Sequence, residues 1–130
     1  MKKILLALIA PLATASAMAQ SDPLWMRFPA ISPDGKTVAF SYKGDIWTVP
    51  ANGGQARQIT TNPAYDAYPV WSPDSRQIAF ASSREGSMDI YVVGRDGGTP
   101  RRVTTDSGDE YPLAWRTDST ILLKASIMPK

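Results

Sequence analysis

Short apolar stretches separated by turn residues make up most of this chain, and the pattern repeats. Residues 69–80 read PVWSPDSRQIAF and residues 29–40 read PAISPDGKTVAF, so the two copies are 40 residues apart. A weaker third copy begins at Pro112. Short stretches of alternating polarity, bounded by Pro, Asp and Gly, are typical of β-strands and turns. A period of about 40–50 residues indicates repeated β units that stack on one another.

Each unit predicts four short antiparallel strands. In the first unit we expect them at 30–32, 37–41, 45–50 and 56–60. The sequence PDGK at 33–36 predicts a turn, because Pro fixes φ, Asp can bond its own backbone and Gly accepts a positive φ. The second unit matches the first strand for strand. It has four extra residues within 82–88, which we expect in a loop.

The strand faces favour a β-propeller over a sandwich. In the second unit Ile78 and Phe80 would point to one face and Ala79 and Ala81 to the other, so both faces are apolar or small. A sheet with one wet face would alternate apolar with charged residues, whereas radial blades pack on both faces. We therefore predict an all-β fold of β-propeller blades, each with four antiparallel strands.

The chain is expected to form an incomplete propeller. The predicted blades cover about 29–68, 69–111 and 112–130, which gives two blades and part of a third. Closed propellers have about four to eight blades. We therefore interpret the sequence as the N-terminal piece of a longer protein, with a ring assembled from several short chains as the alternative.

The first 19 residues predict a secretory signal peptide. Lys2 and Lys3 precede an apolar run at 4–10, and residues 17–19 (AMA) offer small side chains at the cleavage positions. The apolar run is too short to cross about 30 Å of hydrocarbon. We expect residues 20–130 to be exported, to the periplasm or the extracellular space, with no membrane span after signal removal.

Composition excludes several classes of function. Without Lys2 and Lys3, 12 of the 14 basic residues remain against 12 acidic ones, and no block of one sign predicts a nucleic-acid partner. The chain has no Cys and no His. Cys/His zinc sites, thiol catalysis and a complete Ser-His-Asp triad are therefore excluded within these 130 residues. We predict no catalytic residue, no metal site and no cofactor in this chain.

The acids that recur in the repeat are interpreted as structural. Asp34, Asp74 and Asp118 share one turn position, where we expect them to cap the turn. Asp45 and Asp89 precede the third strands of their units, where we expect them to bond hairpin backbone.

Three tryptophans are expected to be buried. Trp71 and Trp115 lie on the first strands of their units and are predicted to pack between blades. Trp25 precedes the first unit and is predicted to pack beneath it.

The connections between units are the candidate contact sites. Each would join the fourth strand of one blade to the first strand of the next, at one rim of the central channel. Acids and aromatics there are suited to contact a peptide substrate or a neighbouring domain. These residues are Tyr65, Asp66, Tyr68, Asp109, Glu110 and Tyr111.

The repeat SPDGKxVAF, followed by GDIWxV and GGxxxxIT, resembles the WD-repeat-like propeller repeat of TolB proteins, tricorn-type serine proteases and prolyl-oligopeptidase-like enzymes. Residues 23–35, just after the predicted signal, are similar to the start of exported bacterial tricorn-type proteases. The second unit departs from the pattern at Ser75, where the repeat has Gly. The third departs at Arg116 and Thr117, which replace Ser-Pro.

The resemblance implies a function within a larger protein. The leading hypothesis is the propeller portion of an exported tricorn-like serine peptidase, which guides or filters peptides for a catalytic domain absent from this chain. Its partners would be peptides and the downstream protease domains of the same full-length chain. In that family the catalytic Ser and His belong to a later domain, so no catalytic residue is assigned here.

Two alternatives remain open. One is a TolB-like periplasmic propeller that binds a protein partner without catalysis. The other is the propeller of a prolyl-oligopeptidase-like peptidase, which would carry an α/β-hydrolase nucleophile elbow further along its chain.

Overall fold

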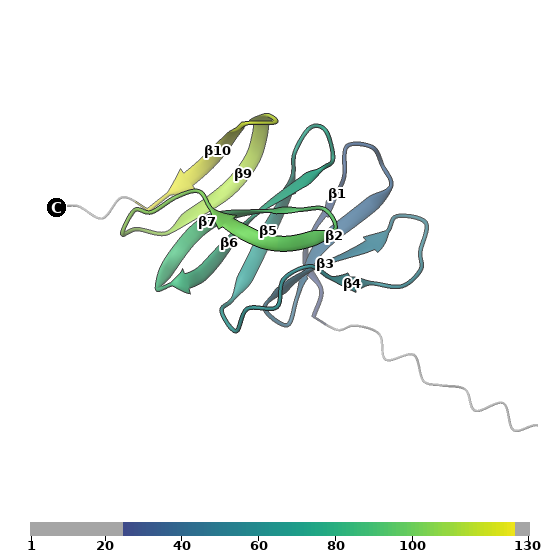
Figure 1. Ribbon diagram of the computed structural model, residues 1–130, viewed down its shortest axis with the longest axis horizontal. Coiled ribbons are helices and arrows are strands. Elements are labelled where there is room, and N and C mark those ends of the chain that lie inside the picture. Colours follow the sequence, from purple (N-terminus) through teal and green to yellow (C-terminus); the bar gives the residue numbers. More distant parts are fainter. Residues whose placement is uncertain (1–24, 127–130) are drawn as a thin grey trace, which may run out of the picture.

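Each of the first two repeats folds into a four-stranded antiparallel sheet in the computed structural model, which describes residues 25–126 (Figure 1). The first sheet contains β1 (Arg27–Ile31), β2 (Thr37–Tyr42), β3 (Asp45–Pro50) and β4 (Arg57–Gln58). The second contains β5 (Asp66–Trp71), β6 (Gln77–Glu85), β7 (Ser87–Gly94) and β8 (Gly97–Arg102). A third, two-stranded sheet contains β9 (Glu110–Thr117) and β10 (Thr120–Ala125).

The all-β prediction is confirmed over the part of the chain that the structure describes. Residues 25–126 contain no helix, and so none long and apolar enough to cross a membrane. Strand order within each four-stranded sheet follows the chain order. The predicted signal peptide, residues 1–19, lies outside the described residues.

The three sheets stand side by side as blades (Figure 1). β1 lies against β5, and β5 lies against β9, so the first strands of the blades converge. We call this side, formed by β1, β5 and β9, the inner edge. β4 and β8 lie at the opposite edges of their sheets.

Strand direction defines two rims. The turn rim carries the turns that follow the first strands, at residues 32–36, 72–76 and 118–119. The connection rim carries the β2–β3 and β6–β7 hairpins and the segments 59–65 and 103–109, which lead from one blade to the next.

Two apolar layers hold the blades together. The second blade faces the first with Ile78 and Phe80, both fully buried, and faces the third with Ala79. The layer between blades one and two consists of Ala39, Ile46, Ile59, Trp71, Ile78, Phe80, Tyr91 and Val93, with Ala30 packed against it. The layer between blades two and three consists of Ala79, Ile90 and Val92, with Val70, Trp115 and Ile121. The prediction that the second sheet is buried on both faces is confirmed.

Tryptophans on the first strands tie each blade to the one before it. The Trp71 indole Nε1–H donates a hydrogen bond to the Ala30 carbonyl oxygen at 2.9 Å. Trp115 repeats this contact with the Val70 carbonyl at 3.2 Å. Their predicted place between blades is confirmed. The prediction for Trp25 is wrong: its side chain is 64% exposed, because it lies beside the β2–β3 hairpin on the connection rim.

The four extra residues of the second repeat do not form the loop that we expected. They lengthen the β6–β7 hairpin, where Glu85 pairs with Ser87 around Gly86. Gly86 has φ of 101°, which only glycine adopts readily. Backbone N–H groups of the extension have partners: Ser83 donates to the Tyr65 carbonyl oxygen and Gly86 to that of Ser83, each at 3.1 Å.

Trp71→Phe should lower the free energy of unfolding by about 0.5–1.5 kcal/mol, because it removes one hydrogen bond between blades and keeps an aromatic ring. The matched variant Trp115→Phe should have a smaller effect, since its hydrogen bond is longer and its side chain is only half-buried. Urea unfolding followed by circular dichroism measures both. A larger loss for Trp115→Phe would contradict this ranking.

Candidate functional site

Three aromatic side chains form a row along the inner edge, which we call the aromatic row. Phe28, Tyr68 and Tyr111 each stand directly before a proline in the first strand of a blade. The ring centroids of Phe28 and Tyr68 are 4.1 Å apart, and those of Tyr68 and Tyr111 are 5.2 Å apart. The Tyr68 side chain remains 37% exposed. The row therefore combines ring–ring contact with a surface that a ligand can reach.

A β-bulge sets the direction of the first two rings. The register of β1 on β2 shifts after Arg27, and that of β5 on β6 shifts after Ala67. Phe28 and Tyr68 have φ of 54° and 59°, in the left-handed region that costs a non-glycine residue about 1–2 kcal/mol. The proline that follows has no N–H and so suits the irregular position. Bulges commonly re-aim a side chain at a binding site.

The six predicted contact residues fall into two groups. The exposed or half-buried members are Tyr65, Tyr68, Asp109 and Tyr111. Asp66 and Glu110 are buried, with exposed fractions of 0% and 3%. The structure brings Tyr68 and Tyr111 together in the aromatic row. It places the Asp66 carboxylate in the interior, away from any ligand on the surface.

Asp109 acts on both the Tyr111 phenol and the β6–β7 hairpin. Burial raises the pKa of Tyr111, and the Asp109 carboxylate raises it further, so the phenol stays protonated at neutral pH. The Asp109 carboxylate accepts a hydrogen bond from the Met88 backbone N–H at 2.9 Å. Asp109 therefore anchors the β6–β7 hairpin to the start of the third blade.

Arg84 forms a buried ion pair with Asp66. Its guanidinium lies 2.8 Å from the Asp66 carboxylate, and the two side chains are 13% and 0% exposed. The same guanidinium lies 4.9 Å from the centroid of the Tyr91 ring. Arg84 belongs to the lengthened hairpin of the second repeat. Nothing in the spacing of the repeats links residue 84 to residue 66, so the sequence did not predict this partner.

Asp45 and Asp89 are structural, as predicted, but their partners differ from the hairpin backbone that we expected. Asp45 accepts a hydrogen bond from the Gln58 side-chain amide at 3.0 Å. Asp89, at the equivalent position, pairs with Arg102 at 2.8 Å. Burial raises the pKa of Asp45, and the nearby Asp66 charge adds to this. Both acids thus join the third strand to the fourth strand of the same blade.

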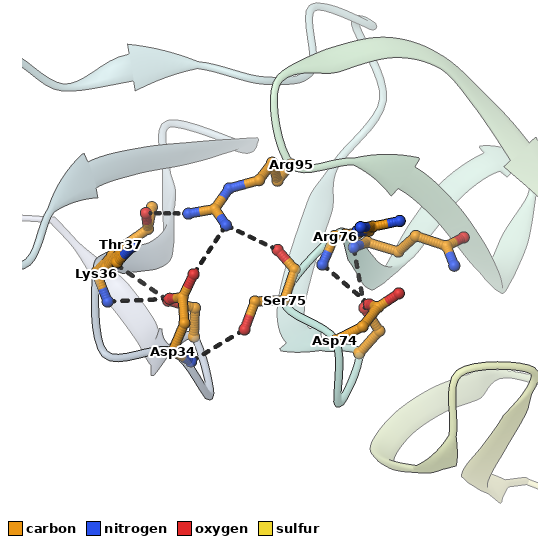
Figure 2. A network of polar contacts seen from close by, with 10 residues as sticks. Asp34, Lys36, Thr37, Asp74, Ser75, Arg76 and Arg95 are labelled. Atoms are coloured by element: carbon orange, nitrogen blue, oxygen red, sulfur yellow. Dashed lines mark hydrogen bonds and ion pairs between the residues drawn. The ribbon is translucent and has the colours of Figure 1, made fainter.

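The recurring turn acids hold the turn rim together (Figure 2). Asp34 accepts hydrogen bonds from the Ser32 hydroxyl at 2.6 Å and from the Lys36 backbone N–H at 3.0 Å. Asp74 makes the equivalent contacts with Ser72 and Arg76. The predicted turn-capping role is confirmed for these two acids.

Asp118 has a different role from the one expected. Its carboxylate accepts a hydrogen bond from the Asp74 backbone N–H at 3.0 Å, across the blade boundary. At the boundary between the first two blades, the Ser75 hydroxyl oxygen accepts the equivalent hydrogen bond from the Asp34 backbone N–H at 3.0 Å. The third turn is one residue shorter between Trp115 and Ile121, so its acid takes the place that Ser75 holds in the second turn.

Arg95 completes the link between the first two blades, and Figure 2 shows it between their turns. It donates to the Asp34 carboxylate at 3.0 Å, to the Ser75 carbonyl oxygen at 3.1 Å and to the Thr37 hydroxyl at 2.7 Å. Asp34 and Thr37 belong to the first blade and Ser75 to the second, so Arg95 bonds both sides of the boundary. The arrangement is a structural clamp, since its polar groups already have partners within the chain.

No group of three acidic side chains within residues 25–126 is placed to hold a metal ion. The aromatic row and the exposed side chains around it on the connection rim form the candidate contact surface.

Four-stranded antiparallel blades that pack face to face define an open β-propeller. Residues 23–128 match the family described as the Tricorn protease N-terminal beta propeller domain. The chain belongs to that family.

Known relatives agree with this assignment. Tricorn protease homolog 1 of Streptomyces coelicolor is 35% identical over 65 residues, which cover 50% of this chain and 6% of that protein. A solved TolB-type structure from Agrobacterium tumefaciens superposes with a TM-score of 0.61 at 30% identity, over 67% of this chain and 32% of that one. The crystal structure of the tricorn protease gives a TM-score of 0.55 at 21% identity, over 69% of this chain and 10% of that one, and shows the fold alone. The chain therefore spans a small part of each of these proteins.

Asp34→Asn should lower stability at about pH 7 and flatten its loss in acid. Hydrogen bonds from Ser32 and the Lys36 N–H, together with Arg95, lower the Asp34 pKa from 3.8 to about 2. Because the pKa is lower in the folded state, the carboxylate stabilises the fold above about pH 4 and loses this effect as pH falls toward 2. Thermal unfolding across this range measures the slope.

The matched variant is Asp74→Asn. The pKa of the Asp74 carboxyl is also lowered, but Asp74 has no arginine partner among the described ion pairs. This variant should flatten the acid slope less than Asp34→Asn does. Parallel acid slopes for the wild-type chain and Asp34→Asn would contradict the assignment.

Arg84→Met should cost about 3–5 kcal/mol in urea unfolding, because it leaves the Asp66 carboxylate buried without its partner. The double variant Asp66→Asn, Arg84→Met should recover part of this loss, since no buried charge remains. A cost below about 1 kcal/mol for the single variant would show that Asp66 reaches water in solution.

Proposed function

We propose that this chain is the propeller portion of an exported tricorn-like serine peptidase. In this proposal it guides or filters peptide substrates for a catalytic domain that lies outside the chain. Its partners are then peptides and the protease domains of the same full-length protein. Membership of the tricorn N-terminal propeller family supports the class of protein. The observation that carries the role is the aromatic row on the inner edge.

The chemistry of the row suits an extended peptide. Aromatic rings offer a large contact area with little loss of side-chain entropy, and a tyrosine hydroxyl can bond a peptide backbone group. Such contacts tolerate many sequences, which a guide for mixed substrates requires. The row follows the first strands from blade to blade, so a peptide that moves along the inner edge meets one ring after another.

Export is part of the proposal. The signal peptide predicted at residues 1–19 supports a periplasmic or extracellular location. Cleavage there would leave Trp25 near the new N-terminus, on the connection rim where the aromatic row begins.

A second candidate is a TolB-like propeller that binds a folded protein without catalysis. It is favoured by the TolB-type structure, which has a higher sequence identity to this chain than the tricorn protease structure has. A serine-peptidase domain encoded after residue 130 would support the first candidate. Binding of a folded protein together with no binding of short peptides would support the second.

Tyr68→Ala should weaken the binding of an unstructured neutral peptide by about tenfold, the typical effect of truncating a central aromatic contact. A fluorescein-labelled decapeptide rich in Leu, Phe and Pro, followed by fluorescence anisotropy, is a suitable probe. Ile31→Ala is the matched control, because Ile31 is also on a first strand and is 61% exposed but lies outside the row. Equal affinities for Tyr68→Ala and the wild-type chain would contradict the proposed role of the row.

A further inference from the structure

We propose that the connection rim of the first blade carries a separate pocket for an acidic side chain of a peptide. The pocket is a hollow of about 170 Å³ lined by Trp25, Arg27, Ser41, Tyr42, Lys43, Gly44 and Tyr65. The inference rests on the proposed function in that the ligand is a peptide, and it adds a preference for Asp or Glu next to an apolar residue.

The charge of the lining favours a carboxylate. Arg27 and Lys43 are the charged residues among those that line the hollow, and both are cations. Neither takes part in the ion pairs formed within residues 25–126. Among the described residues, the two acids next to this hairpin have partners of their own: Asp66 pairs with Arg84, and Asp45 accepts from Gln58. A carboxylate in the hollow would therefore meet positive charge with no acid of the lining opposing it.

Aromatic rings hold both cations in place. The Arg27 guanidinium carbon lies 5.9 Å from the Trp25 ring centroid, and the Lys43 ammonium lies 5.3 Å from that of Tyr42. These cation–π contacts restrict the two side chains and leave hydrogen-bond donors for a ligand. Trp25 and Tyr65 are 64% and 45% exposed, so they offer apolar walls for the methylene groups of the ligand.

The size of the hollow fits one acidic side chain. Its volume of about 170 Å³ equals that of five or six liquid waters at about 30 Å³ each. Gly44 lines one wall beside the Tyr65 ring, where a Cβ would be in ordinary contact with the ring at 3.6 Å. The hollow thus admits a carboxylate with its methylenes but no folded element.

The backbone conformation of Lys43 indicates that its side chain has a role besides forming the turn. Lys43 and Gly44 are the two central residues of the β2–β3 hairpin, with φ of 51° and 83°. Such turns favour Asn or Gly at the first of these positions, so lysine is a strained choice. Strained residues gather at binding and catalytic sites. The equivalent hairpin of the second blade is longer and turns at Gly86, so the pocket is a feature of the first blade alone among the described hairpins.

Lys43→Asn separates binding from folding. Asn suits the positive φ, so thermal stability should rise or stay unchanged, while affinity for an acidic peptide should fall by about fivefold. The probe is the hexapeptide Ala-Ala-Leu-Glu-Ala-Ala, acetylated and amidated, with its Glu→Gln counterpart. The wild-type chain should bind the Glu peptide about fivefold more tightly than the Gln peptide, and added salt should reduce the difference.

Two further variants test the position of the site. Arg27→Gln should weaken binding of the Glu peptide as Lys43→Asn does. Arg101→Gln, which removes an exposed cation on β8, should leave it unchanged.

NMR locates the bound peptide. The Trp25 indole N–H signal should shift on titration with the Glu peptide, while those of Trp71 and Trp115, which are hydrogen-bonded between blades, should not. Equal binding of the Glu and Gln peptides would overturn the proposal. So would a Gln peptide with a free C-terminal carboxylate that bound as tightly as the Glu peptide, because the site would then recognise chain ends. Binding of neutral peptides that depends on Tyr68 would survive either result, so this inference and the proposed function fail separately.

Discussion

The burial of the second sheet on both of its faces is the constraint on which the rest of this structure depends. Ile78 and Phe80 of β6 pack against the first blade, and Ala79 between them packs toward the third. Alanine at that position lets the neighbouring blade approach closely, while the larger side chains fill the opposite layer. Both faces of β6 must be covered by a neighbouring blade to exclude water. The blades therefore stand face to face, and their first strands converge. The aromatic row exists only because of that convergence.

Polar contacts at the two rims supply what the apolar layers lack, which is a fixed register between blades. On the turn rim Arg95 reaches from the second blade to Asp34 of the first. On the connection rim the Ser41 hydroxyl of the first blade donates a hydrogen bond to the Asp66 carbonyl oxygen of the second at 2.7 Å. Apolar packing alone would tolerate small slides of one blade over another, whereas these directional contacts hold at one position. The hydrogen bonds that Asp34 and Asp74 accept within their own turns also explain why these recurring acids are poor candidates for ligand binding.

Repetition made the fold predictable, because each turn and strand appears at least twice in the sequence. Contacts between units were less predictable from that repetition. The pairing of Asp66 with Arg84 and the shifted role of Asp118 depend on how far a hairpin reaches and on one deleted turn residue. The aromatic-Pro pairs were visible in the sequence, but the contact between their rings required the bulges to turn them toward one another. Likewise the lining of the pocket at Lys43 comes from three separate segments, which no local pattern connects.

Native-state hydrogen exchange tests most directly whether burial between two neighbours holds the structure together. If it does, the backbone amides of residues 78–81 in β6 should exchange slowest, at a rate set by global unfolding. Those of β10, at the edge of its two-stranded sheet, should exchange much faster through local opening. Equal and rapid exchange in β6 and β10 would show that the second sheet does not depend on its neighbours, and would contradict the central role of its burial.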